Sequence, residues 1–439
     1  MSDGDGFDDL IAPFSRRGVD LGLERLQAAL AELGHPERRF AAVQVAGTNG
    51  KGSISTMLER IASAAGLRCG LYTSPHLLSW CERIRLPGGL IAPAELRRLL
   101  EALQPVALRH DLTPFELITA AAFQAFAEAD VELAVLEVGL GGRLDATTVH
   151  PDRQVLAFGS IGLDHTEHLG PTLAAIAAEK AGVLHAAAVA VSGAQEWEAA
   201  AVLDRQASAC GCALRWVDPL PPVAEGGPVL GLNGVLQRRN GAVAAAAARA
   251  LAERGWAISE AAILQGLASA RWPGRLERRR FRGRPLLLDG AHNPPAARAL
   301  RSELDQGRDG AAAIGSPPAA RHWLIGIQRH KDAPELLQAL LRPGDVVRVA
   351  ALSEHNSWSA DELRAVQGGE AQGLGREAQA VGGATVAITP ASGDLQADLA
   401  WLVSSPLLPV ACGSLYLVGA LLPLLDPTDA APAGAGTTD

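Results

Sequence analysis

The sequence has little cysteine, and none of its segments is apolar for long enough to cross a membrane. Its five cysteines are an odd number without framework spacing, which argues against a disulfide scaffold and indicates a reducing compartment. The first ten residues, MSDGDGFDDL, offer neither a basic region nor an apolar core, so they do not look like a secretory signal. We therefore expect a cytoplasmic protein without a membrane partner.

Positive charge is also in short supply. Lys and Arg number 39 against 48 Asp and Glu, and the net charge of −9 argues against a nucleic-acid groove, although a local basic pocket for phosphates stays possible. The run Arg278–Arg280 is accordingly interpreted as solvated linker. At 439 residues, with 48% hydrophobic residues, the chain has an ordinary globular composition and is too long for one compact core, so two domains are expected.

The stretch Val43–Ser53, VQVAGTNGKGS, joins a short apolar run to a glycine-rich turn that holds one lysine. Such a turn, followed by a helix expected over 54–65, predicts a cradle for phosphates. Lys51 would reach the terminal phosphates, and the serine two residues later could place its hydroxyl on Mg²⁺. The strict P-loop pattern has glycine and Ser or Thr where this chain has Val45 and Gly52. An ordinary glycine turn is the alternative, but it leaves the lysine and the serine without a role.

Two expected strands end in residues able to bind a metal. The apolar run Val131–Val138 carries Glu137 at its far end, and the strand expected over Val155–Ile161 is followed by Asp164 and His165. Carboxyl ends of strands form the ligand crevice of an open α/β sheet, so an ionised glutamate there is better explained by a metal than by burial. A lone histidine is more often a satisfied structural group, but its place beside Glu137 favours a ligand.

Lys180 shares one face of an expected helix with three apolar residues, Leu173, Ile176 and Ala177. A lysine on such a face normally extends to water. The functional alternative is a desolvated lysine that is chemically modified or paired with a charge. Similarly, Phe115 belongs to an apolar stripe over 113–129 that is ordinarily core.

The pattern breaks near Trp272-Pro273-Gly274-Arg275, which we take as the domain boundary. Beyond it, strands expected near 286–288, 324–327, 346–350, 384–388 and 410–417 alternate with helices, so a second doubly wound α/β unit is predicted. Asp289 ends the first of these strands, and Asn240 is expected to head an alanine-rich helix before the boundary. The tail from Asp426 is of low complexity and expected to be disordered.

Several motifs together carry a family resemblance. They are AGTNGKGS, SPHL, ERIR, TPFE, EVGLGGRLDAT, GLDHT with EKAG, PGRLE, LDGAHNP and GSLYLVG, in order between residues 46 and 419. The chain resembles the folylpolyglutamate synthase/dihydrofolate synthase family of the Mur-ligase superfamily. The resemblance implies a P-loop-type doubly wound parallel sheet in residues 1–275, a smaller Rossmann-like α/β domain in 276–425 and a tail over 426–439.

The resemblance also implies an activity and its residues. The activity is ATP-dependent ligation of L-glutamate to dihydropteroate and to reduced folates through an acyl phosphate, by a monomer that takes only small molecules as partners. The residues implied for ATP are Thr48, Asn49, Gly50, Lys51, Gly52, Ser53, Asn240, Arg275, Asp289 and His292. Those implied for the pterin are Asp20, Leu21, Gly22, Leu23, Thr113, Pro114, Phe115, Glu116, Leu144, Asp145 and Ala146. Two Mg²⁺ ions would be held by Ser74, Glu137 and His165, and the catalytic residues would be Lys51, His165 and Lys180, the last as a carbamate.

The chain departs from the family pattern at a few positions. Pro114 stands where an aromatic residue is common, Thr148 replaces a frequent asparagine, an acidic residue is missing before Lys331, and the loop 353–358 lacks an arginine. The alternatives are a superfamily ligase acting on a cell-wall precursor and, from another class, a P-loop ATPase switch. The absence of a separate uridine-binding N-terminal domain argues against the first, and the lack of an aspartate-ended hydrophobic strand of the required kind argues against the second.

Overall fold

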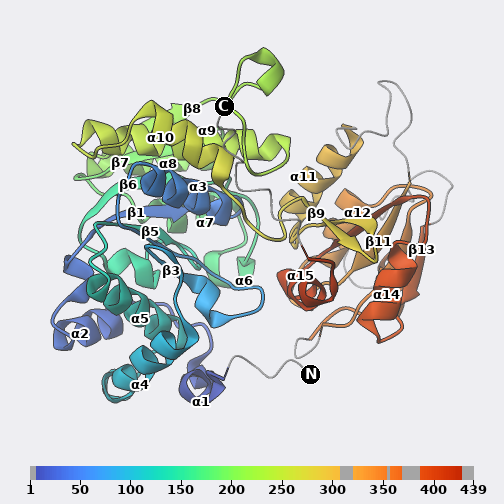
Figure 1. Ribbon diagram of the computed structural model, residues 1–439, viewed down its shortest axis with the longest axis horizontal. Coiled ribbons are helices and arrows are strands. Elements are labelled where there is room, and N and C mark those ends of the chain that lie inside the picture. The colour runs from blue at the N-terminus through green and yellow to red at the C-terminus, as the bar shows by residue number, and fades with distance from the viewer. Residues whose placement is uncertain (1–5, 307–319, 353–355, 368–385, 428–439) are drawn as a thin grey trace, which may run out of the picture. The chain divides into compact units, whose positions relative to one another are not determined.

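The computed structural model describes residues 6–306, 320–352, 356–367 and 386–427 (Figure 1). The chain forms two compact units, Met1–Trp272 and Pro273–Asp439. Each unit is an α/β structure with a mostly parallel sheet, as the sequence predicts. Within the described ranges, no helix combines the length and the apolar character that a membrane span requires.

The sheet of the first unit has eight strands in the order β4-β3-β2-β5-β1-β6-β7-β8. In this order, the strands β2, β5, β1, β6, β7 and β8 pair with one another in parallel. Strands β3 and β4 are added at the β2 edge in antiparallel pairing. The strands are β1 Ala41–Ala46, β2 Cys69–Tyr72, β3 Ile84–Leu86, β4 Gly89–Leu90, β5 Leu133–Glu137, β6 Arg153–Phe158, β7 Val189–Gly193 and β8 Ala213–Val217.

Helices cover both faces of this sheet. The helices are α1 Asp8–Ile11, α2 Glu24–Glu32, α3 Lys51–Ala64, α4 Pro93–Arg109, α5 Pro114–Glu128, α6 Thr166–Leu169, α7 Leu173–Ala181, α8 Trp197–Cys210, α9 Val235–Glu253 and α10 Glu260–Ser269. Figure 1 shows α3, α9 and α10 together on one side and α2, α4 and α5 on the other. Because both faces are covered, every residue of β1 is buried, which is typical of a parallel sheet.

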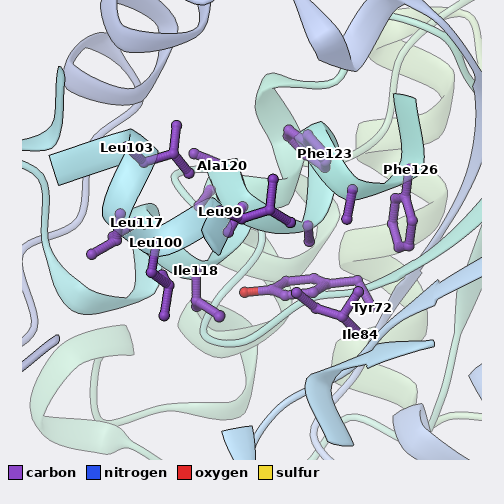
Figure 2. Packing of buried hydrophobic residues seen from close by; sticks show 14 of the residues in the cluster. Tyr72, Ile84, Leu99, Leu100, Leu103, Leu117, Ile118, Ala120, Phe123 and Phe126 are labelled. Carbon is purple, nitrogen blue, oxygen red and sulfur yellow. The ribbon is translucent and has the colours of Figure 1, made fainter. Parts of the chain in front are cut away.

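The layer formed by α4 and α5 packs tightly on the sheet beneath it. Figure 2 shows Phe123, Phe126 and Ile118 of α5 beside Tyr72 and Ile84 of the sheet. Full burial of each large apolar side chain stabilises the fold by about 1.5–3 kcal/mol. The hydroxyl of Tyr72 lies 2.8 Å from that of Thr119. The helix that carries the predicted pterin segment is therefore held firmly against β2.

The strand order explains why distant parts of the sequence share one edge of the sheet. Strands β2, β5, β1 and β6 are successive neighbours. Since parallel strands end at the same edge, the residues that follow them come together there. Glu137 is the register partner of Val45, two residues before the glycine turn. The ligand crevice predicted from the strand ends is thus this edge.

The second unit has six strands in the order β13-β12-β11-β14-β10-β9, of which only β9 is antiparallel to its neighbour. The strands are β9 Glu277–Phe281, β10 Arg284–Leu288, β11 Arg321–Ile325, β12 Val346–Val349, β13 Ala387–Pro390 and β14 Leu408–Cys412. The helices are α11 Pro294–Asp305, α12 Ala333–Leu340, α13 Ala360–Gln367, α14 Leu395–Leu402 and α15 Leu415–Leu421. Short 3-10 turns occur in both units at Ala12–Arg17, Pro36–Arg38, Trp80–Arg83, Ala146–Val149, Val223–Glu225 and Leu422–Leu424.

Some sequence expectations are wrong in detail. Arg278–Arg280 are not linker but the centre of β9, and an edge strand with one open side explains their polar pattern. The strand expected over 410–417 ends at Cys412, because Gly413 turns with φ 99° and Ser414 caps α15. The first helix of the phosphate region begins at Lys51, three residues before the expected 54.

A buried aspartate ties several elements of the second unit together. Asp345, just before β12, accepts hydrogen bonds from Arg301 of α11 (3.1 Å), from the backbone N–H of Arg321 (2.7 Å) and from that of Arg342 (2.9 Å). Arg301 and Asp345 are each only 1% exposed. Breaking a buried pair of this kind leaves a charge without its partner.

We expect Asp345→Ala to destabilise the second unit by about 3–5 kcal/mol, the usual cost of breaking a buried ion pair. Glu335→Ala is the matched control, because its exposed bond to Arg298 also joins α11 and α12 yet should contribute less than about 1 kcal/mol. Urea unfolding of the full chain, combined with hydrogen exchange of peptides from β11 and α11, measures both. Equal exchange in the two variants would contradict the assignment.

Candidate active site

The glycine turn after β1 is shaped by two residues with positive φ. Gly47 has φ 140° and Gly50 has φ 87°, values that L side chains rarely adopt. A Cβ on Gly47 would lie 3.0 Å from the Cα of Gly159, and one on Gly159 only 2.3 Å from the carbonyl oxygen of Asn49. The turn therefore packs directly on the backbone that leaves β6, and larger residues at either glycine would force the two segments apart.

Hydrogen bonds fix the same contact. The N–H groups of Thr48 and Asn49 both donate to the carbonyl of Ser160, at 2.8 and 3.0 Å. The hydroxyl of Thr48 donates to the carbonyl of Gly162 and accepts from its N–H. The phosphate loop is thus anchored to the segment that leads to His165, and this brings two of the predicted site regions together.

Helix α3 starts inside the glycine turn. Lys51, Gly52 and Ser53 are its first residues, and the first N–H groups of a helix have no intrahelical acceptor. These groups and the helix dipole form a site for an anion, and the terminal amine of Lys51 adds a full positive charge beside it. In this structure that amine donates to the carbonyl of Thr48 at 3.2 Å, so the lysine folds back over the loop.

Asn240 lies against the loop, as a nucleotide-site residue should, but from an unexpected position. It is not at the start of its helix, because α9 begins five residues earlier at Val235. A Cβ on Gly50 would come within 2.5 Å of the Asn240 side-chain oxygen. The Asn240 amide donates to Gln237 one turn earlier, at 3.0 Å. Gln237 therefore orients the amide, a role that the sequence does not reveal.

Glu137 and Ser74 meet at the ends of neighbouring strands β5 and β2. Glu137 is 4% exposed, and its carboxylate accepts the N–H of Ser74 at 3.3 Å. His165 is half-exposed and lies within 4 Å of the carboxylates of Asp164 and Glu167. Among the described residues, no three His, Cys, Asp or Glu side chains gather closely enough to hold a metal. Carboxylate and hydroxyl oxygens are nevertheless hard ligands of the type that suits Mg²⁺ or Mn²⁺, and Glu137 and Ser74 supply one of each.

Lys180 lies inside the protein and not at its surface. It is 4% exposed, and burial together with the charge of Lys51 lowers the pKa of its amine to about 7. The carboxylates of Asp164 and Asp145 act in the opposite direction, by favouring the charged form. The alternative of a lysine extending to water is therefore wrong. Near neutral pH this amine is readily available in its neutral, nucleophilic form.

The third predicted pterin segment is held by Asp145. Its carboxylate accepts from the N–H groups of Gly139 (2.9 Å) and Leu140 (3.0 Å), and from both the N–H (3.0 Å) and the hydroxyl (2.5 Å) of Thr147. Burial raises the pKa of Asp145, and these hydrogen bonds oppose the shift. Since a carboxylate accepts about four hydrogen bonds, Asp145 acts here by fixing the glycine-rich loop 139–146.

Phe115 joins the second predicted pterin segment to this loop. A Cβ on Gly139 would lie 2.5 Å from the Phe115 ring, and the ring centroid is 6.1 Å from that of Tyr72. The unusual Pro114 is the first residue of α5, where its fixed φ suits a helix start. Thr148, the other departure in this region, donates to the carbonyl of Gly142 and accepts from Gln44. Both departures are thus compatible with the local structure.

The predicted nucleotide residues of the second unit form a local group of their own. The two carboxylate oxygens of Asp289 accept the N–H groups of Leu276 (2.9 Å) and Ala291 (2.8 Å). Burial raises the pKa of Asp289, and the charge of Arg275 opposes that shift. His292 contacts the carbonyl of Gly290 through Nδ1 at 2.8 Å. The segment at the end of β10 is therefore a preformed turn with a cation beside it.

Two residues that sequence reasoning missed also belong to these groups. In the sequence, Trp272 serves only to mark the domain boundary, but its indole ring packs directly against Gly52. A Cβ on Gly52 would lie 3.0 Å from the nearest atoms of that ring. Arg25 bonds to both Asp20 and Glu116. A signal for Arg25 was available, because a cation in the first turn of a helix opposes the dipole and so requires carboxylate partners.

Comparisons with known proteins agree on one family. The profile described as "Dihydrofolate synthetase, C-terminal domain" matches residues 275–424. The dihydrofolate synthase/folylpolyglutamate synthase of Mycobacterium tuberculosis is 33% identical over 363 residues, which are 73% of this chain and 72% of the relative. A solved structure of Escherichia coli FolC in complex with DHPP and ADP superposes with TM-score 0.79 at 28% identity and covers 96% of this chain and 99% of the other.

A second solved structure adds other ligands. It is the bifunctional folylpolyglutamate synthase/dihydrofolate synthase with Mn, AMPPNP and L-glutamate bound, to which this chain is 28% identical with TM-score 0.74. The match covers 96% of this chain and 99% of that one.

We expect Lys51→Ala to lower ATP turnover by about 100-fold or more, because it removes the charge that we expect to neutralise the phosphates and removes no core volume. Arg60→Ala is the control: it deletes a cation from the same helix, but one that pairs with Glu59 away from the loop. Steady-state release of ADP at saturating ATP measures both variants. Unchanged turnover in Lys51→Ala would remove the phosphate-loop assignment.

Proposed function

This chain belongs to the dihydrofolate synthase/folylpolyglutamate synthase family, and from that membership we propose how its residues divide the work. The protein is an ATP-dependent ligase that joins L-glutamate to folates. We propose in addition that one site serves both dihydropteroate and reduced folates that already carry a glutamate. Both substrates present a carboxylate on a pterin-bearing arm, so the same phosphate chemistry can serve both.

One observation carries this proposal. The buried amine of Lys180 is in electrostatic reach of Lys51 in the phosphate loop and of Asp145 in the third predicted pterin segment. The loop that holds Asp145 also packs beside Lys180, since a Cβ on Gly142 would lie 3.0 Å from the Lys180 carbonyl oxygen. These observations support a nucleotide side and a pterin side that meet near one buried group. An arrangement of this kind supports transfer of a phosphoryl group to a carboxylate held on the pterin side.

The reaction requires activation, because a carboxylate oxygen is a poor leaving group. Transfer of the γ-phosphoryl group of ATP to the substrate carboxylate gives an acyl phosphate and ADP. The amine of glutamate then attacks the acyl carbon, an amide forms, and phosphate leaves with a proton released. Such phosphoryl transfer depends on positioning and charge neutralisation more than on covalent chemistry from the protein.

On the nucleotide side, the start of α3 and Lys51 neutralise the phosphates, and Thr48, Asn49, Gly50, Gly52 and Ser53 shape the loop around them. The side chain of Asn240, which lies beside Gly50, limits the space above the loop. In the second unit we assign Arg275, Asp289 and His292 to nucleotide binding, on the support of their preformed turn.

Ser74, Glu137 and His165 are the residues that would hold divalent metal. The hard oxygens of Ser74 and Glu137 fit Mg²⁺, and we propose two such ions in the working enzyme. When bound, magnesium would neutralise charge on the triphosphate and on the acceptor carboxylate. The chain's own contribution is to hold Glu137 in place through the N–H of Ser74 and the pairing of β5 with β1.

The pterin platform would consist of Asp20–Leu23, Thr113–Glu116 and Leu144–Ala146. Phe115 packs near Tyr72 and Gly139, and contact of an aromatic ligand with its ring would add about 0.5–1.5 kcal/mol beyond the buried area. Asp145 contributes indirectly, through the loop that it fixes.

We further propose that Lys180 carries a carbamate. An ammonium would be repelled by Lys51 and by metal, whereas a carbamate would be attracted by both. A carbamate forms only from the neutral amine, and the lowered pKa of Lys180 supplies that form near neutral pH.

The protein should act as a monomer in the reducing cytoplasm. Each of its five cysteines is a free thiol, which supports a reducing compartment.

The central prediction is that the wild-type protein releases ADP with glutamate plus dihydropteroate and, separately, with glutamate plus a reduced folate. Omission of the pterin substrate should abolish ADP release, because no carboxylate is then available for activation. ADP release with reduced folate but not with dihydropteroate, each in the presence of glutamate, would restrict the enzyme to chain extension. ADP release independent of any carboxylate would instead indicate an ATPase switch, and release that requires a cell-wall precursor would indicate the other ligase class.

For Lys180, protein loaded with ¹³C-bicarbonate should give a carbamate carbon resonance that grows as pH rises through about 7, because deprotonation exposes the nucleophile. Lys180→Met should lack this resonance and be inactive, with partial recovery of activity on addition of acetate. Arg60→Ala, which removes a cation paired with Glu59 away from the loop, serves as the control, since it should keep the resonance. An identical spectrum for wild type and Lys180→Met would refute the carbamate.

A further inference from the structure

Arg25 lies where a cation is unfavourable. It is the second residue of α2, and the N-terminus of a helix carries partial positive charge. The N-cap, Leu23, provides no side-chain hydrogen bond to this helix end. Glu24 in the same first turn is acidic and offsets part of this charge, and carboxylates from outside the helix can offset more of it.

The compensation comes from two carboxylates far apart in the sequence. Nη1 of Arg25 lies 3.0 Å from a carboxylate oxygen of Asp20, and Nη2 donates to the Asp20 carbonyl at 2.7 Å. Nε donates to Oε2 of Glu116 at 3.3 Å, across 91 residues of chain, and Nη2 lies 3.3 Å from Oε1. The planar guanidinium therefore bridges two segments, which a lysine could not do with the same geometry.

Arg25 is placed to act through these partners and not on a substrate. Its donors are directed at Asp20 and Glu116, and the backbone of Gly22 passes close by, since a Cβ there would lie 3.9 Å from both Nη atoms. Glu116 in turn accepts the N–H of Thr113 at 2.7 Å and closes the cap of α5. The position of Arg25 thus sets where the segment 20–23 lies relative to the start of α5.

Glu116 retains an acceptor after these contacts. It is 3% exposed, and within the described residues no group donates an aligned hydrogen bond to Oε1, although Arg25 neutralises its charge nearby. A buried carboxylate oxygen without a hydrogen bond is costly, so the ion pair with Arg25 is what compensates it. The preceding residue, Phe115, packs its ring against Gly139 on the same platform.

We propose that Arg25 is a positioning residue that sets the affinity of the site for the pterin end of the substrate. It ties Asp20–Leu23 to Thr113–Glu116 and so fixes the relative position of two segments of the proposed pterin platform. The proposal rests on the ligase function and pterin platform given above. The hydrogen bonds and ion pairs given above join Arg25 to Asp20 and Glu116 and not to the phosphate loop. We therefore expect Arg25 to affect binding of the pterin substrate and not of ATP or glutamate.

The test is steady-state kinetics of Arg25→Gln with each substrate varied in turn. KM for dihydropteroate should rise about tenfold or more, the effect of losing hydrogen bonds between charged groups, while kcat and the KM values for ATP and glutamate stay within about twofold. Arg25→Lys should give an intermediate KM. Arg109→Gln is the matched control, because it breaks an exposed ion pair to Glu32 at the other end of α2 and should change no KM.

Binding and coupling measurements separate this role from a general loss of structure. Titration with dihydropteroate in the absence of ATP should show the same weakening as KM. The effects of Arg25→Gln and Glu116→Gln should be far from additive, since one residue acts through the other. An Arg25→Gln enzyme with unchanged pterin KM, or with all three KM values raised together, would overturn the proposal. A wild type inactive on every pterin substrate would instead overturn the ligase function itself.

Discussion

The burial of one amine, that of Lys180, constrains the chemistry of the first unit. A charged ammonium in a low-dielectric interior is costly, and here burial and the nearby charge of Lys51 lower its pKa to about 7. Asp164 and Asp145 offset part of that cost. The phosphate loop, the segment after β6 and the glycine-rich loop must therefore keep their relative positions, because each supplies one charge to the same balance.

Close backbone contacts maintain those positions. Gly47 and Gly159 bring the phosphate loop onto the end of β6, and Gly139 admits the ring of Phe115. A Cβ on Gly182 would lie 2.3 Å from the Cβ of Arg143, so the end of α7, just past Lys180, also packs on the glycine-rich loop. Small residues at these crossings let loops from different strands meet without a gap. Glycine is therefore abundant in the motifs for two reasons: close contacts between loops leave no room for a side chain, and some of the turns need positive φ.

The difference between local patterns and contacts of distant segments explains how much of the structure the sequence could predict. The buried strand that ends in Glu137 and the lysine turn are local patterns, and their existence and order follow from periodicity and turn chemistry. The convergence of their ends follows from parallel pairing. The start of α9 was missed because the polar residues Gln237–Asn240 conceal its first turns, and β9 was missed because an edge strand of arginines lacks a buried pattern.

Side-chain links between distant segments were the least predictable part of the site. Neither the bridge from Arg25 to Glu116 nor the contact of Phe115 with Gly139 has a short-range sequence signature, since each depends on how α2, α5 and the loop 139–146 pack.

The two sides of the proposed site consequently differ in how readily their residues can be replaced. The nucleotide side is built from backbone groups and glycines, where substitution strains the fold. The side proposed for the pterin is held by side-chain contacts, and departures from the family pattern such as Pro114 and Thr148 fit its local structure. We therefore expect residues to vary more readily on the proposed pterin side than in the phosphate loop.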